Sequence, residues 1–154
     1  MLLTGGVLTG VASLMHVAII FGGADWYRFF GAGERMARLA ASGSLYPTIL
    51  TAFIAIVLGI WAFYAFSGAG VIRRLPFLRV GLVLIAAVYL MRGSMGIPAI
   101  LFVDDPYSQQ LKAKMTFMIV TSIICLFLGF CYAAGAWNVW RRATAGSALA
   151  GIER

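Results

Sequence analysis

Four long apolar segments dominate the chain, and each is long enough to cross a lipid bilayer. Met1–Ala24, Leu39–Ile72 and Met115–Trp140 carry no charged residue, and Val80–Val103 carries only Arg92. A membrane-spanning helix needs about 20 predominantly apolar residues. Because lipid offers the backbone no hydrogen-bond partner, segments of this length are favoured as helices that satisfy their own polar groups. The sequence therefore predicts an all-α integral membrane protein with four spans.

Composition supports one membrane domain. Of the 154 residues, 62% are hydrophobic and 11% are charged, which lies outside the range of ordinary soluble domains. Short connections predict an up-down four-helix bundle over residues 1–142, followed by a mobile polar tail at 143–154. The expected spans are about 2–21, 47–66, 78–101 and 116–140.

Each expected span has one face of small or polar residues at helical spacing. In lipid, helices associate through such faces, because close approach and hydrogen bonding replace the hydrophobic drive. We expect these faces to meet inside the bundle. They are Gly5, Thr9, Ser13 and His16; Thr48, Ala52, Ala55, Gly59 and Ala62; Gly81, Ile85, Tyr89 and Arg92; and Met118, Ser122, Cys125, Gly129 and Ala133.

Arg92 is the residue that costs most to place in a bilayer. A charge at the centre of a span costs about 2.5–3.5 kcal/mol on insertion scales, so such side chains face the protein interior, water or a partner. We expect Arg92 to bind a ligand. Two alternatives stay open: it reaches the lipid headgroups, or it only fixes the bundle by pairing with Asp25 or Glu34.

The six residues after Arg92, Gly-Ser-Met-Gly-Ile-Pro, predict a break in the third span. Pro98 has no amide hydrogen, so the carbonyl of Ser94 loses its helical donor. Broken helices in membranes often line binding sites. The alternative interpretation is an ordinary end to a short helix.

The candidate ligand-binding residues are His16, Tyr89 and Arg92, which we expect in the half of the bundle near loop one, together with Asp25 and Glu34 from that loop. His16 alone has an alternative role as a hydrogen bonder between helices. With one histidine and no suitable cysteine pair, we expect no metal site and no other cofactor. We assign no catalytic residue, and enzymatic activity is not favoured.

Loops one and two differ in character. Loop one contains Glu34–Ala41, a run of helix formers that predicts a short helix lying in the membrane interface, either as an anchor or as a lid over the pocket. Loop two, which includes Arg73, Arg74 and Pro76, reads as a short basic turn.

The net charge of +7 comes from cations that flank the spans, as membrane orientation requires, so we expect no nucleic-acid partner. Six basic residues lie on the side of loop two and the tail and five on the side of loops one and three, and this small difference favours cytoplasmic termini. Loop two and the tail carry Arg73, Arg74, Arg79, Arg141, Arg142 and Arg154, and loops one and three carry Arg28, Arg35, Arg38, Lys112 and Lys114.

The stretch FGGADWYRFFGAGERMA, with LYP before the second span and RRLP after it, resembles small four-helix bacterial inner-membrane proteins of uncharacterised activity. The resemblance covers most of the chain, from Gly10 to about Trp137. It implies a multi-pass protein of the bacterial inner membrane and implies no activity.

Three functional hypotheses follow. The leading one is binding of a small anionic or lipid ligand in a polar pocket in the outer half of the bundle, with membrane lipids as partners. The second is a non-catalytic accessory subunit of a larger membrane complex, or a homo-oligomer. The third is a small proton-coupled transporter or intramembrane enzyme that uses His16 with Asp25 or Glu34.

Overall fold

The structure is a computed structural model that describes the backbone of residues 1–102 and 115–152 and the side chains of 1–95 and 117–141. These residues form helices and connecting turns and contain no strand. The long helices are α1 (Leu2–Phe29), α3 (Tyr46–Gly68), α4 (Leu78–Phe102) and α6 (Met115–Ile152). All four are long and apolar enough to cross a membrane. The prediction of an all-α chain with four candidate spans is confirmed.

The short helix α2 occupies Glu34–Ala41, the residues predicted for it in loop one. The residues predicted as a tail at 143–154 are helical as far as Ile152, because α6 continues through them, and their mobility stays a prediction. The third loop lies outside the described residues.

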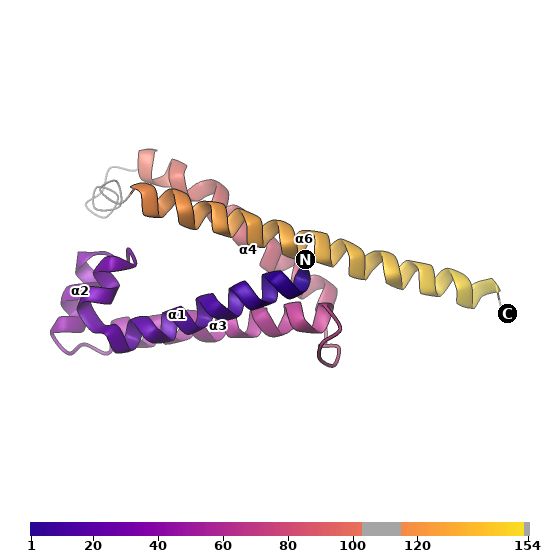
Figure 1. The fold of residues 1–154 in the computed structure, drawn as a ribbon, viewed down its shortest axis with the longest axis horizontal. Helices are drawn as coiled ribbons and strands as arrows, with labels where there is room; N and C mark the ends of the chain where they lie inside the picture. The colour runs from indigo at the N-terminus through magenta and orange to yellow at the C-terminus, as the bar shows by residue number, and fades with distance from the viewer. Residues whose placement is uncertain (103–114, 153–154) are drawn as a thin grey trace.

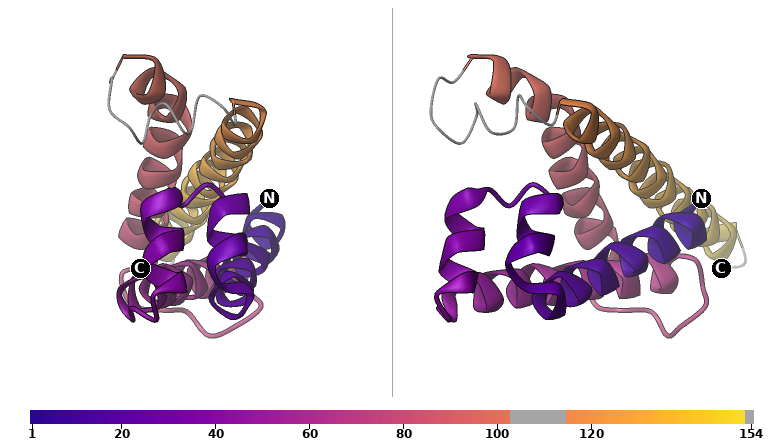
Figure 2. Two further views of the ribbon diagram at one scale, coloured as in Figure 1. Left: turned by 90° about the vertical axis from the view of Figure 1, so that its left-hand side faces the viewer. Right: turned by 60° about the vertical axis from the view of Figure 1, so that its left-hand side comes forward.

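The long helices alternate in direction and pack as two pairs, α1 along α3 and α4 along α6 (Figure 1). The two pairs meet at the end that carries the N-terminus and loop two, and they diverge toward α2 (Figure 2). Only 11% of the residues in the apolar window of α1 are buried, against 33% for α6. The up-down order is therefore as expected, but the four helices do not enclose one another along their whole length.

A single core cluster joins the two pairs where they meet. Its largest fully buried members include Tyr132 and Leu82, and Thr9 lies buried beside them. The cluster takes residues from all four long helices, which explains why the pairs hold together at this end. Its buried residues are Leu2, Ala65, Leu78, Leu82, Ile85, Ala86, Tyr89, Leu128, Tyr132 and Ala136.

Two glycines set the close approach of α4 and α6. A Cβ atom added at Gly93 would lie 2.9 Å from the backbone nitrogen of Leu126, and one added at Gly129 would lie 3.0 Å from the backbone nitrogen of Leu90. The leucine side chain is also in the way at each position, but because one obstructing atom belongs to the backbone, rotation of that side chain cannot relieve the clash completely. Each helix thus places a glycine against a leucine of the other helix. Membrane helices commonly pack closely through small residues in this way.

The expected break after Arg92 is wrong, because α4 is one helix from Leu78 to Phe102 and passes through Pro98. Gly93 serves close packing and does not end the helix. The Ser94 hydroxyl donates to the carbonyl of Leu90 at 2.8 Å, a bond back to the preceding turn that is compatible with helix. Proline is tolerated inside membrane helices, where local adjustments satisfy the freed carbonyl.

Helix α1 changes direction at Gly23, where the first span was expected to end. Gly23 has φ 65° and ψ −153°, a combination that is essentially restricted to glycine. The last turns of α1 then fold against α2 as a helical hairpin (Figure 2). Tyr27 and Ala37 are buried there in a small cluster that also includes Ile19 from before the turn. The hairpin also approaches the start of α6, where the rings of Phe30 and Phe117 lie 6.5 Å apart.

We expect Gly129→Ala to destabilise the protein by about 1–3 kcal/mol, the usual cost of overpacking a tight contact. The measurement is thermal unfolding in detergent. The matched control is Gly10→Ala, where the nearest atom to the new Cβ is that of Ala62 at 3.9 Å. That variant should melt at or above the wild-type temperature, since alanine is the better helix former. Equal melting of the two variants would contradict the packing role of Gly129.

Candidate functional site

Arg92 lies beside the packed face of α4 and not on it. The buried positions recur as Leu82, Ile85, Tyr89 and Gly93, a helical spacing from which Arg92 is offset. The Arg92 side chain is exposed, and it makes no hydrogen bond or ion pair with any residue that the structure describes. A charged group on an apolar helix is thus left without a protein partner within the described ranges.

Tyr89, by contrast, is buried in the junction of the four helices. Its hydroxyl lies 3.2 Å from Oγ1 of Thr9, which lies 3.1 Å from the hydroxyl of Tyr132. The Tyr132 hydroxyl also donates to the carbonyl of Trp61 at 3.0 Å. Since each hydroxyl has one proton, the chain runs from Tyr89 to Thr9, then to Tyr132 and to Trp61. Tyr89 is therefore part of a hydrogen-bond chain that connects α1, α3, α4 and α6.

His16 is half-buried, and its nearest polar partner belongs to its own helix. Nδ1 lies 2.8 Å from the carbonyl of Ala12. Because a carbonyl only accepts, Nδ1 carries the proton, and in the neutral ring Nε2 is left as an acceptor. The adjacent Ser13 hydroxyl donates to the carbonyl of Ala55 at 2.7 Å and is the group that links α1 to α3 here.

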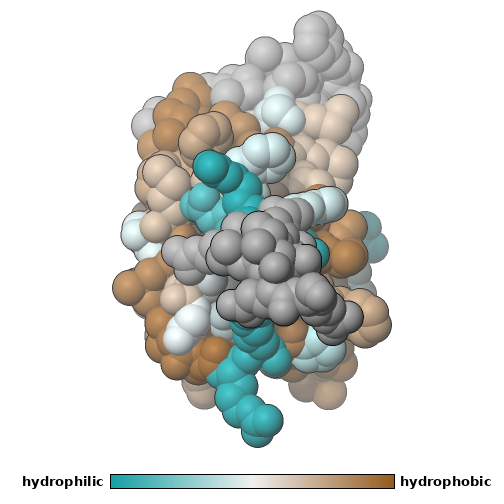
Figure 3. Space-filling view, turned by 90° about the vertical axis from the view of Figure 1, so that its right-hand side faces the viewer, coloured by the Kyte–Doolittle hydropathy of each residue, from teal (hydrophilic) through white to brown (hydrophobic). Residues whose placement is uncertain are grey.

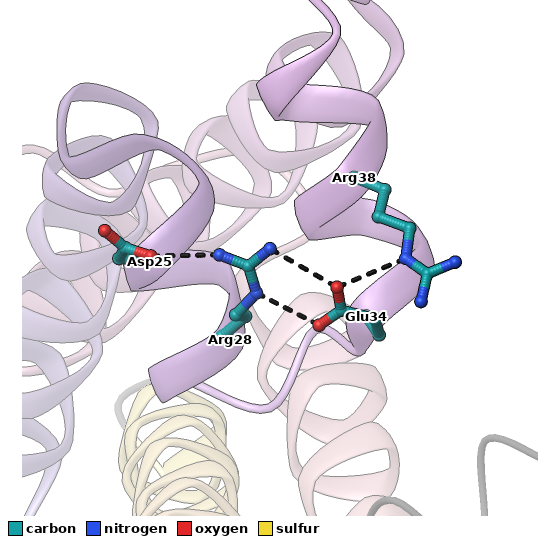
Figure 4. A network of polar contacts seen from close by, with 4 residues as sticks. All are labelled: Asp25, Arg28, Glu34 and Arg38. Atoms are coloured by element: carbon teal, nitrogen blue, oxygen red, sulfur yellow. Dashed lines mark hydrogen bonds and ion pairs between the residues drawn. The ribbon is translucent and has the colours of Figure 1, made fainter.

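Asp25 and Glu34 come together in a charged network at the α1–α2 hairpin (Figure 4). Arg28 contacts Asp25 through Nη1 at 2.9 Å and grips Glu34 through Nε at 3.0 Å and Nη2 at 3.3 Å. Arg38 adds a contact to Glu34 at 3.2 Å. Hydrogen bonds from Arg28 and then Arg38 hold the pKa of Glu34 below its ordinary value. Both carboxylates are thus paired with Arg28 and not with Arg92.

The five residues predicted to line one pocket therefore do not share a set of contacts in the structure. Tyr89 belongs to the hydroxyl chain, Asp25 and Glu34 to the hairpin network, and His16 bonds within α1. Of the five, Arg92 is the one left with an unpaired charge among the described residues. Ligand binding by these five residues stays a prediction. Its best candidate is Arg92, because the other four have partners within the protein.

Loop two contains a feature that sequence reasoning missed. A hollow of about 400 Å³ opens there, which is within the range of small-molecule sites, about 300–1,000 Å³. Five of its lining residues are apolar and two are arginines. They are Arg74, Leu75, Phe77, Leu78, Arg79, Val80 and Val139. Seen from this end, hydrophilic and hydrophobic surfaces lie side by side (Figure 3).

The backbone of loop two is held by two side chains of α3. The buried Ser67 hydroxyl donates to the carbonyl of Arg73 at 3.0 Å and accepts from the amide of Leu75 at 2.9 Å. The Tyr64 hydroxyl donates to the carbonyl of Pro76 at 3.3 Å. These bonds fix the position of the loop relative to α3.

Phe77 adopts a left-handed conformation, with φ 52°, immediately before α4 begins. A bulky residue in that region is strained by about 1–3 kcal/mol and persists only where its surroundings enforce it. Its side chain is 83% exposed, so packing of the ring inside the protein does not account for this geometry. The basic residues on either side were a visible signal in the sequence, but the hollow also needs Val139, which is distant along the chain.

No protein-family model, curated protein or solved structure matches the chain. Within the described ranges, no three histidine, cysteine or acidic side chains are grouped so that they could hold a metal ion.

Acid should release the α1–α2 hairpin. Because the pKa of Glu34 is lowered by folding, its stabilising contribution is complete above the ordinary value of 4.5 and is lost as pH falls through the lowered pKa. A spin label at Ser42, in a variant without the native cysteines, should become more mobile in a step below pH 4.5. Glu34→Gln should be mobile at neutral pH and show no step. The same step in that variant would contradict the assignment.

Loop two should loosen when its anchor is removed. Ser67→Ala leaves the Leu75 amide without the hydroxyl acceptor, and loss of a buried partner costs about 1–3 kcal/mol. We expect faster hydrogen exchange at the Leu75 amide. Ser42→Ala is the control, because the exposed Ser42 hydroxyl only donates to the carbonyl of Leu39 at 3.0 Å. Unchanged exchange at Leu75 would show that Ser67 does not hold the loop.

Proposed function

We propose that this multi-pass membrane protein binds an anionic lipid headgroup through Arg92. The observation that carries the proposal is an exposed guanidinium on a helix apolar enough to span a membrane, with no partner among the described residues. A charge in that setting needs a counter-ion or water. An anionic headgroup is the counter-ion that the surrounding bilayer supplies.

The position of Arg92 along α4 fits a headgroup of the leaflet on the side of loop one. At about 1.5 Å per residue, Arg92 lies about 20 Å along the helix from Arg79. A hydrocarbon core is about 30 Å thick. With Arg79 at one interface, the other is about 10 Å beyond the Arg92 backbone, a distance that an extended side chain and a dipping headgroup cover together.

The small excess of arginine around loop two and the C-terminus favours cytoplasmic termini. With the resemblance to bacterial inner-membrane proteins, this suggests that Arg92 serves the outer leaflet of that membrane. The orientation is part of the proposal and is separable from lipid binding itself.

A second candidate function is that of an accessory subunit in a larger membrane complex. The supporting observation is α1, of which only 11% of the apolar window is buried. Exposed apolar residues on α1, such as Leu3, Val11 and Leu14, would suit a partner helix. Co-migration with a larger complex on a native gel would support this function, and a lone monomer in mild detergent would count against it.

An acid–base function receives less support. The carboxylates of Asp25 and Glu34 are both ion-paired with Arg28, and the lowered pKa of Glu34 keeps it ionised near neutral pH. An ionised carboxylate held by two arginines is a poor proton donor to His16.

Removing the Arg92 charge should weaken retention of phosphatidylglycerol by the purified protein. Charge-assisted hydrogen bonds contribute about 1.5–3 kcal/mol, so Arg92→Ala should cost about ten- to hundredfold in affinity. Arg92→Lys should keep part of it, since lysine keeps the charge but loses the two-pronged geometry. Native mass spectrometry with added phosphatidylglycerol or phosphatidylcholine gives the measurement.

Arg35→Ala is the matched control. Arg35 is an exposed arginine of α2 that, like Arg92, makes no hydrogen bond or ion pair within the described part of the chain. Its loss removes the same charge from outside a span and should change retention less than twofold. Equal retention by wild type and Arg92→Ala would overturn the proposal.

A further inference from the structure

We propose a second binding site, in the hollow at loop two, for a phosphate group that carries an apolar chain. A membrane phospholipid has this chemistry. The site does not depend on Arg92, because it lies at the opposite end of the apolar part of α4.

The cationic half of the site consists of Arg74 from the loop and Arg79 from the first turn of α4. Neither side chain has a hydrogen bond or ion pair with another described residue. The two carboxylates that the structure describes, Asp25 and Glu34, are both used by Arg28 at the far hairpin. Two free guanidinium groups beside one hollow match the oxygens of a phosphate, which arginine binds in a two-pronged manner.

The start of α4 adds to the attraction for an anion. Leu78, Arg79 and Val80 line the hollow and form the first turn of a helix of 25 residues. The amide groups of a first turn have no carbonyl partner inside the helix and carry a partial positive charge. An anion bound in the hollow would thus lie near two guanidinium groups and near the positive end of α4.

The apolar half of the site distinguishes a lipid from free phosphate. Leu75, Phe77 and Val80 line it from the loop and α4, and Val139 lines it from α6. Inorganic phosphate would gain nothing from these side chains, whereas an acyl chain would cover them. The loop joins two helices long and apolar enough to span a membrane, which puts the hollow near the membrane surface and within reach of a lipid headgroup.

The site is held in shape before any ligand arrives. Ser67 and Tyr64 fix the loop backbone through three hydrogen bonds. Phe77 has a left-handed backbone although its ring is exposed. Backbone strain is common at ligand clamps, and here it places an aromatic ring on the rim of the hollow, beside the two arginines.

The test measures phosphatidylglycerol binding by native mass spectrometry in an Arg92→Ala background, so that only the loop-two site is read. Arg74→Gln combined with Arg79→Gln should weaken binding at least about tenfold, since each arginine near a membrane surface contributes about fivefold. Arg73→Gln is the matched control. It removes an exposed arginine of the same loop that does not line the hollow, and it should change binding less than twofold.

Two further arms test the apolar half. Val80→Trp places a large ring at an exposed lining position and should weaken lipid binding while both arginines remain. Its melting temperature without lipid shows whether the fold is kept. Inorganic phosphate at millimolar concentration should not displace the lipid.

Three results would overturn the proposal. In the first, Arg73→Gln weakens binding as much as the double variant, which would mean that only general charge matters. In the second, Val80→Trp folds and binds normally. In the third, inorganic phosphate displaces the lipid, which would remove the acyl chain from the ligand. None of these depends on whether Arg92 binds lipid.

Discussion

The chain of hydroxyl groups through Thr9 is the interaction on which the arrangement of the four long helices depends. Tyr89 of α4, Tyr132 of α6 and the carbonyl of Trp61 in α3 meet there. With Thr9 of α1, each of the four long helices contributes one polar group. Away from water, an unmatched hydroxyl is costly, and the helices are held where all three are matched. The rings add contacts, with Tyr89 centred 5.2 Å from Trp61 and 5.7 Å from Tyr132. Away from this junction the two pairs separate, and among the described residues no comparable chain of hydrogen bonds joins them there (Figure 2).

The helices were predictable because bilayer thickness and backbone hydrogen bonding act on any apolar run of this length. The same holds for α2, whose sequence is rich in helix formers. Which face of α4 packs was only partly predictable. Tyr89 and Ile85 belong to the buried face as expected, but the next buried position is Gly93 and not Arg92. Glycine can end a helix or bring two helices close, and only the position of α6 decides between these uses.

The candidate site shows a similar limit. Arg92 was identified from the sequence because placing a charge inside a bilayer costs free energy. In the structure its charge is unpaired within the described residues. Sequence reasoning did not foresee that Arg28 would take both carboxylates, since the contact with Glu34 depends on the turn between α1 and α2, where Gly31 and Gly33 have positive φ. It also passed over loop two, where the hollow depends on Val139 approaching from α6. Contacts between residues far apart in sequence carry most of this missing information.

The turn at Gly23 has one more consequence. The end of α1 and α2 share a small buried cluster with Ile19, which lies before Gly23. They are connected to the long helices through Gly23, through the residues that lead from α2 into α3, through packing of α2 on α3, and through a ring contact between Phe30 and Phe117. Because this cluster has few buried residues, the hairpin should open at a lower free energy than the four-helix junction, so its amides should exchange faster.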